Sequence, residues 1–274
     1  MSTRKVSSHI PRKRFGQNFL IDESVIDGII AAIAPRPEDN LVEIGPGLGA
    51  LTAPLLARLK RLQVIEIDRD LISRLRETHP RDRLLIHEGD VLKFDFSSLG
   101  ADLRIAGNLP YNISTPLLFR FAGFAAGIRD IHVMLQREVV ERMVALPGDS
   151  EFSRLSVMLQ YRFDMEMLFA VPPEAFDPAP KVDSAIVRLI PLAPLPCPAR
   201  NETVFAAVVT RAFAQRRKTL RNTLKGMVSA AQLTTLGIDA GARAQELSVA
   251  DFVRIADAIT NAEPESEPTG AAEA

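Results

Sequence analysis

The tetrapeptide at 108–111 combines an amide side chain, main-chain carbonyls beside a proline and an aromatic ring. Its members are Asn108, Leu109, Pro110 and Tyr111, and they follow an apolar run at 103–106 that predicts a buried strand. Such groups are suited to holding a flat base, because carbonyl oxygens accept from its exocyclic amine and the tyrosine stacks on its ring. The amine lone pair is delocalised, so acceptors that orient it could suffice without a carboxylate base. The alternative is a strand-to-helix turn in which Asn and Pro serve only the backbone.

A glycine-rich turn at 45–49 follows residues 41–44, which predict another buried strand. Gly45 and Gly47 would allow a sharp turn and a close approach between the backbone and a ligand. Glu66 ends the next predicted strand, 21 residues after Gly45. Dinucleotide-binding folds carry an acid at this distance for the ribose hydroxyls, so the pattern is shared by dinucleotide and S-adenosylmethionine sites.

Three details favour S-adenosylmethionine over a dinucleotide. The glycine spacing at 45–49 differs from the pattern that sets a helix start against a pyrophosphate. Glu43 lies inside an apolar strand, which is unusual for a charge unless it orders the loop around a cationic ligand. Asp90 ends the third predicted strand, where it could accept from an adenine amino group. The alternative for Asp90 is a helix cap or turn residue.

Composition limits the classes of protein that this chain can belong to. Of its 274 residues, 47% are hydrophobic, enough for a sizeable core, yet no apolar run is long enough to cross a bilayer. The N-terminus is basic but lacks the apolar segment of a secretory signal. Cys197 is the single cysteine, and no Cys/His cluster has the spacing of metal ligands. We therefore expect a cytoplasmic protein with no metal site and no membrane association.

Basic residues are concentrated in two acid-free segments, 1–14 and 210–225, although the formal net charge is −1. Four glutamates in the last twelve residues offset this positive charge in the net charge of the chain. For binding phosphates, a local basic patch matters more than the net charge of the whole chain. The alternative is that each basic segment is only the solvated face of a helix. The candidate phosphate-binding residues of the second segment are Arg216, Arg217, Lys218 and Arg221, and Lys181 is a further candidate outside both segments.

Apolar runs alternate with helical patterns over most of the chain. The predicted strands cover residues 41–44, 62–67, 84–87, 103–106, 131–135 and 185–190. The predicted helices cover residues 51–60, 69–78, a segment around 117–121, and 136–146. This alternation predicts a doubly wound, Rossmann-like α/β fold with a mostly parallel sheet. The run at 185–190 has no crossover helix before it, which suggests an antiparallel strand.

Four prolines within residues 191–198 predict a stiff linker, which we place at 191–200. Before it lies an α/β domain over 15–190, and after it a small all-helical domain over 201–261. We expect a flexible basic arm at 1–14 and a disordered acidic tail at 262–274.

The sequence closely resembles the ribosomal RNA adenine dimethyltransferases, the family of the small-subunit enzyme whose loss gives kasugamycin resistance. The resemblance extends from Arg12 to about residue 259. The motifs that carry it lie at residues 14–20, 43–49, 108–111, 176–184 and 215–222.

The resemblance implies transfer of two methyl groups from S-adenosylmethionine to N6 of each of two adjacent adenosines near the 3′ end of small-subunit rRNA. It also implies a monomer that acts on a pre-30S particle and binds RNA through its helical domain. By the same resemblance, the cofactor contacts fall on Asn18, Leu20, Gly45, Gly47, Glu66, Asp90, Val91 and Asn108.

Roles follow for the residues around the target base. Asn108 and the carbonyl of Leu109 or Pro110 would accept from the N6 hydrogens, while Tyr111 stacks on one face. Phe176 would cover the other face, or would instead be a buried loop anchor. The alternative for Asn18 and Leu20 is ordinary packing at the entry to a helix.

Three other functions compete with this one. The large-subunit rRNA methyltransferases that confer macrolide resistance are the nearest, but the motifs at 176–184 and 215–222 favour the small-subunit branch. A non-catalytic assembly factor would not need an intact tetrapeptide at 108–111. A nucleotide-dependent oxidoreductase would share the glycine turn and Glu66, yet nothing in the sequence supplies a hydride-transfer site.

Overall fold

The computed structural model describes residues 17–262, which form two compact units. Within this range, the first unit comprises residues 17–144 and 162–193, and the second comprises 145–161 and 194–262. The expected basic arm at 1–14 lies outside the described residues, as does the expected acidic tail apart from residue 262.

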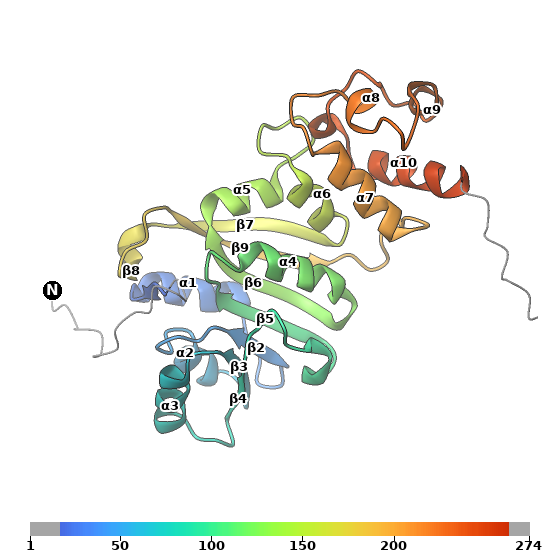
Figure 1. The fold of residues 1–274 in the computed structure, drawn as a ribbon. Helices are drawn as coiled ribbons and strands as arrows, with labels where there is room; N and C mark the ends of the chain where they lie inside the picture. The colour runs from blue at the N-terminus through green and yellow to red at the C-terminus, as the bar shows by residue number, and fades with distance from the viewer. Residues whose placement is uncertain (1–16, 263–274) are drawn as a thin grey trace, which may run out of the picture. The chain divides into compact units, whose positions relative to one another are not determined.

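The first unit is built on a seven-stranded sheet in the order β4-β3-β2-β5-β6-β9-β7 (Figure 1). Its strands are β2 (Leu41–Ile44), β3 (Leu62–Glu66), β4 (Leu84–Glu88), β5 (Leu103–Asn108), β6 (Ile128–Gln136), β7 (Phe163–Val171) and β9 (Ser184–Pro191). Strands β2 to β6 pair in parallel, whereas β9 runs antiparallel to both of its neighbours. The doubly wound α/β prediction is confirmed, as is the antiparallel direction of the late strand. The strand order reverses between β2 and β5, which opens a crevice at their carboxyl ends.

Helices of the first unit include one that the sequence analysis did not anticipate. They are α1 (Glu23–Ile33), α2 (Thr52–Leu56), α3 (Arg69–Thr78), α4 (Ser114–Gly123) and α5 (Arg137–Val144), with short 3₁₀ turns at Phe96–Leu99, Ala125–Gly127 and Pro173–Ala175. The unanticipated helix is α1. Asp22 caps it by accepting from the amides of Ser24 and Val25, and Ile29, Ile30 and Ile33 bury one face in the core.

A separate two-stranded sheet fixes the segment that precedes α1. Strand β1 (Phe19–Leu20) pairs antiparallel with β8 (Phe176–Asp177), so that Leu20 lies opposite Phe176. The amide of Ile21 also donates to the Ala175 carbonyl at 2.8 Å. Residues 19–20 are therefore extended and paired with a segment far along the chain, and they lead directly into α1 through its cap at Asp22.

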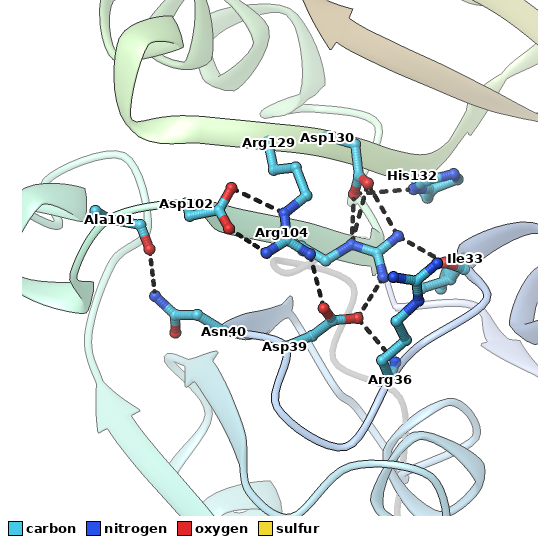
Figure 2. A network of polar contacts seen from close by, with 10 residues as sticks. All are labelled: Ile33, Arg36, Asp39, Asn40, Ala101, Asp102, Arg104, Arg129, Asp130 and His132. Carbon is cyan, nitrogen blue, oxygen red and sulfur yellow. Dashed lines mark hydrogen bonds and ion pairs between the residues drawn. The ribbon is translucent and has the colours of Figure 1, made fainter.

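A network of charged side chains ties the beginning of β5 to its surroundings (Figure 2). Arg104 is 7% exposed and forms ion pairs with Asp39 at 2.6 Å and with Asp130 at 2.9 Å. Its guanidinium also donates to the carbonyl of Ile33, the last residue of α1. Arg129 bridges Asp39 to a further carboxylate at the surface. Because a buried charge is costly without a partner, this network fixes the end of the strand opposite the crevice.

The second unit is helical and has a core of its own. It contains α6 (Arg154–Gln160), α7 (Glu202–Ala212), α8 (Leu220–Thr223), α9 (Ala230–Thr235), a 3₁₀ turn at Ala244–Glu246, and α10 (Val249–Ala262). Phe152, Val157 and Tyr161 are buried in this core with Phe205 and Phe252. The predicted boundary at 190 was therefore incomplete, because the apolar side chains of 145–161 pack with residues beyond the linker. None of the helices described in either unit is long and apolar enough to span a membrane.

Candidate active site

A cavity of about 270 Å³ lies at the carboxyl ends of the central strands of the first unit. It brings together every cofactor-contact residue expected from the sequence, together with the tetrapeptide at 108–111. The expected residues that line it are Asn18, Leu20, Gly45, Gly47, Glu66, Asp90, Val91, Asn108, Leu109, Pro110 and Tyr111. The crevice at the strand-order reversal therefore gathers residues from five separate segments of the chain.

The glycine turn after β2 requires glycine at two positions that line the cavity. Gly45 has φ +64° and Gly47 has φ +58°, conformations that L-residues with a side chain rarely adopt. A Cβ at Gly47 would also lie 3.3 Å from the ring of Phe19, which covers this turn. The turn thus leaves the backbone open to a ligand on one side while β1 packs against it on another.

Two buried carboxyl groups lie in the cavity wall. Glu43 is 1% exposed and accepts from the Thr52 hydroxyl at 2.6 Å. Burial raises its pKa to about 7, and the neighbouring Glu66 adds to the effect. Burial also raises the pKa of Glu66, although its carboxylate accepts from the amides of Ile67 and Asp68, both at 2.8 Å, which opposes the shift.

This donor and acceptor set fits a cationic ligand that carries hydroxyl groups. A positive charge in the cavity would stabilise the ionised forms of Glu43 and Glu66, which burial disfavours. Glu66 has acceptor capacity beyond its amide bonds, because an ionised carboxylate offers about four lone-pair sites. S-adenosylmethionine, with its ammonium, sulfonium and ribose hydroxyls, has the properties that these residues require. Within residues 17–262, no three His, Cys, Asp or Glu side chains gather in a way that could hold a metal ion.

Asp90 is a turn residue whose side chain also lines the cavity. One of its carboxylate oxygens accepts from the Leu92 amide at 2.9 Å, and its carbonyl accepts from the Lys93 amide, as expected of a turn residue. The side chain also lines the cavity, and its second oxygen has no protein partner among the described residues. Val91 is buried beside it and contributes an apolar wall.

Asn108 is the last residue of β5 and has a fixed amide orientation. Its Nδ2 donates to the carbonyl of Asn18 at 3.1 Å, so Oδ1 is left as an acceptor with no partner in the described part of the chain. The preceding Gly107 allows this placement, since a Cβ there would lie only 2.4 Å from the carbonyl oxygen of Ile44 on β2. Gly107 was not among the residues predicted for the site, although a glycine inside a strand is a known sign of close backbone approach.

The structure discriminates between the two carbonyls proposed to accept from the base. The Pro110 carbonyl already accepts from the Ile113 amide at 3.1 Å. The Leu109 amide donates to the Met134 carbonyl on β6, whereas no described residue donates to the Leu109 carbonyl. Leu109 therefore offers the free acceptor next to Asn108. Tyr111 contributes its ring to the cavity and its hydroxyl to a hydrogen bond with Ser184.

Phe176 does not line the cavity, in contrast to the role over the base that the resemblance implied. It lies in β8, is 4% exposed, and packs in a core cluster that includes Leu20 and Ala175. Its partner across the two strands, Leu20, belongs to the same core cluster. The structure therefore favours the alternative, a buried anchor for the loop.

The expected RNA-binding residues are exposed in both units. In the second unit, Arg216 donates to the carbonyl of Ser150. The exposed residues of the expected set are Arg216, Arg217, Lys218 and Arg221 in the second unit and Lys181 in the first.

Comparison with known proteins identifies the family. The model of the family described as ribosomal RNA adenine dimethylase matches residues 8–261. The chain belongs to this family. A relative from Chromobacterium violaceum, named ribosomal RNA small subunit methyltransferase A, is 62% identical over 92% of this chain and 97% of its own length.

Two solved structures support the same conclusion about the fold. A dimethyladenosine transferase from Plasmodium falciparum is 28% identical, with a TM-score of 0.75 over 86% of this chain and 95% of that one. The 23S rRNA methyltransferase ErmE is 27% identical, with a TM-score of 0.69 over 89% of this chain and the whole of that one. The family resemblance inferred from the motifs is confirmed, and with it a methyltransferase fold of the dimethylase type.

Proposed function

We propose that this chain transfers methyl groups from S-adenosylmethionine to N6 of adenosine in small-subunit ribosomal RNA. The observation that carries the proposal is the pair of free acceptors, Asn108 Oδ1 and the Leu109 carbonyl, beside a cavity suited to a cationic ligand. The small-subunit assignment rests on relatives such as the one from Chromobacterium violaceum, which is far more similar to this chain than ErmE is.

The cofactor would be held by residues that line the cavity. Glu66 would accept from the ribose hydroxyls, and the free oxygen of Asp90 would accept from the adenine amino group, beside Val91. Asn18 and Leu20 would close the methionine end against the glycine turn. When bound, S-adenosylmethionine supplies an electrophilic methyl group on a sulfonium that is a good leaving group.

The target adenine would be held by the tetrapeptide at 108–111. Asn108 Oδ1 and the Leu109 carbonyl would accept hydrogen bonds from the two N6–H groups. These bonds orient the amine so that its lone pair leaves conjugation with the ring and points toward the cavity. The ring of Tyr111 stacks on the base. Methyl transfer leaves N6 positively charged with two N–H bonds, and this acidic cation releases one proton to water. A single N–H then remains, and one acceptor is enough to hold it for the second transfer. No side chain is needed as a general base in this scheme.

The wider substrate follows from the family and from the charge of the second unit. We infer that the target is a pair of adjacent adenosines near the 3′ end of the small-subunit rRNA in a cytoplasmic pre-30S particle, bound by a monomer. Arg216, Arg217, Lys218 and Arg221 would contact phosphates through the second unit, and Lys181 through the first.

Mass mapping of methylated nucleotides tests the proposal. The protein and S-adenosylmethionine are incubated with unmodified small subunits and, separately, with large-subunit rRNA. We expect N6,N6-dimethyladenosine in the small-subunit rRNA only, and none with the Asn108→Ala variant. Methylation restricted to the large-subunit rRNA would favour the ErmE-like alternative. A protein that binds S-adenosylmethionine in calorimetry but methylates neither RNA would be a non-catalytic assembly factor.

A further inference from the structure

Tyr111 is tied at its hydroxyl to a residue that the proposed chemistry does not use. Its hydroxyl oxygen lies 2.8 Å from Oγ of Ser184, a hydrogen-bonding distance. Ser184 is 0% exposed and does not line the cavity. Among the described residues, its hydroxyl has no other hydrogen-bond partner. The buried Ser184 hydroxyl is therefore bonded to one side chain, and that side chain lines the cavity.

The antiparallel strand brings Ser184 to this position. It is the first residue of β9, and because β9 runs against β6, its beginning lies at the edge where the parallel strands end. Ser184 pairs with Gln136, two residues beyond Met134, which pairs with Asn108. The start of β9 thus projects beyond the end of β5, level with the turn that carries Tyr111.

We propose that Ser184 is a positioning residue that holds the Tyr111 ring in the orientation against which the target base stacks. This inference rests on the proposed function, because it assigns a use to a ring that is taken to contact adenine. It assigns a positioning role to a residue of the motif at 176–184, through its bond to Tyr111 and without contact with the base.

Hydrogen bonds hold Tyr111 at its main-chain carbonyl and at its side-chain hydroxyl, and the second bond orients the ring. The carbonyl of Tyr111 accepts from the Ser114 hydroxyl at 2.9 Å, which fixes the main chain. The side chain can still rotate about two bonds, and the bond to Ser184 restricts that rotation from a rigid, buried strand. A base that enters the cavity then meets a preoriented ring and does not have to order it. Since Ser184 does not contact the cavity, its loss should affect turnover and leave cofactor affinity unchanged.

Kinetics of the variants Ser184→Ala and Tyr111→Phe, singly and together, test the inference. A neutral hydrogen bond predicts that each single variant lowers kcat about two- to tenfold, with the Kd for S-adenosylmethionine unchanged. Because both variants remove the same bond, the double variant should be no slower than the slower single one. Tyr161→Phe is the matched control, since it removes the hydroxyl of the only other tyrosine, which lies in the core of the second unit. Its kcat should equal that of the wild type.

Tyrosine spectroscopy supplies a readout that is independent of turnover. The chain has two tyrosines and no tryptophan, so Tyr111 is the sole source of near-ultraviolet dichroism above the phenylalanine bands in a Tyr161→Phe background. In that background, Ser184→Ala should reduce the Tyr111 signal while thermal unfolding remains cooperative. An unchanged signal with unchanged kcat, or losses that multiply in the double variant, would overturn the inference.

The outcomes separate this inference from the proposed function. If the wild type does not methylate small subunits, the proposed function fails, whereas the dichroism result still reports whether Ser184 orders the ring. If the wild type is active and Tyr111→Phe has wild-type kcat, the positioning role fails alone. Should Ser184→Ala not fold, the Tyr111→Phe result decides the question.

Discussion

Glu43 offers the sharpest quantitative prediction, because it is a fully buried carboxyl group in the cavity wall with one hydrogen-bond donor, Thr52. In the folded protein its pKa is about 7, against an ordinary value of 4.5. Below pH 4.5 the carboxyl group is protonated in both the folded and the unfolded states, so its ionisation does not change the free energy of unfolding. As the pH rises toward 7, the unfolded state ionises first, and the free energy of unfolding of the cofactor-free protein falls. At about 1.4 kcal/mol per pH unit, the loss reaches about 3 kcal/mol above pH 7.

Glu43→Gln removes this loss, because the amide is neutral at every pH and can still accept from Thr52. The variant and the wild type should have similar stability at pH 4.5, and at pH 8 the variant should be more stable by up to about 3 kcal/mol. Urea unfolding at several pH values measures this difference.

Tyr111 fluorescence in a Tyr161→Phe background follows the first unit alone, which matters because two units need not unfold together. Glu77→Gln, a change at an exposed glutamate of α3, is the matched control and should leave the pH dependence as in the wild type. Parallel stability curves for Glu43→Gln and the wild type from pH 4.5 to 8 would refute the reasoning.

Three further predictions concern the base site, the charged network and the RNA surface. Asn108→Ala should lower kcat by at least about 100-fold, because an acceptor for the reacting amine is lost, while calorimetry finds cofactor affinity within a few-fold of the wild type. Arg104→Ala should lower the free energy of unfolding by about 3–5 kcal/mol, because its aspartate partners are left buried without a counter-charge, and urea titration measures this loss. Replacing Arg216, Arg217 and Lys218 by glutamine should weaken RNA binding and flatten the plot of log K against log salt by about 2, if each contacts one phosphate.

Each of these predictions has an outcome that contradicts it. Retained methylation by Asn108→Ala would remove that residue from the chemistry. A stability loss below about 1 kcal/mol for Arg104→Ala would mean that water reaches the network and solvates its acids. For the basic segment, Arg188→Gln is a matched control at an exposed arginine that is paired with Glu166 at 2.6 Å. If this control changes the salt dependence as much as the triple variant does, the segment at 216–218 is an ordinary solvated surface.

Much of the site was predictable because its parts lie at the ends of strands. The glycine turn, Glu66, Asp90 and Asn108 each follow an apolar run of strand length, and parallel strands bring their carboxyl ends to one edge. Local periodicity and turn chemistry therefore determined which residues face the cavity. The sequence also predicted the antiparallel direction of β9, from the absence of a crossover helix before it.

The tertiary structure decided what depends on partners distant in the chain. Phe176 pairs with Leu20 and is buried with it in one core cluster. The packing of 145–161 assigned that segment to the second unit. Only the fold shows that the Pro110 carbonyl is already bonded and that of Leu109 is free. The bond between Tyr111 and Ser184 joins the turn after β5 to the first residue of β9, a strand that is not a neighbour of β5 in the sheet. Hydrophobic periodicity is a property of a few consecutive residues, whereas hydrogen-bond partners and burial depend on which segments meet in space. For this reason the sequence alone determined the site residues that end strands, and the tertiary structure decided the place of Phe176, the parts of Gly107 and Ser184, and the contacts and pKa values of the rest.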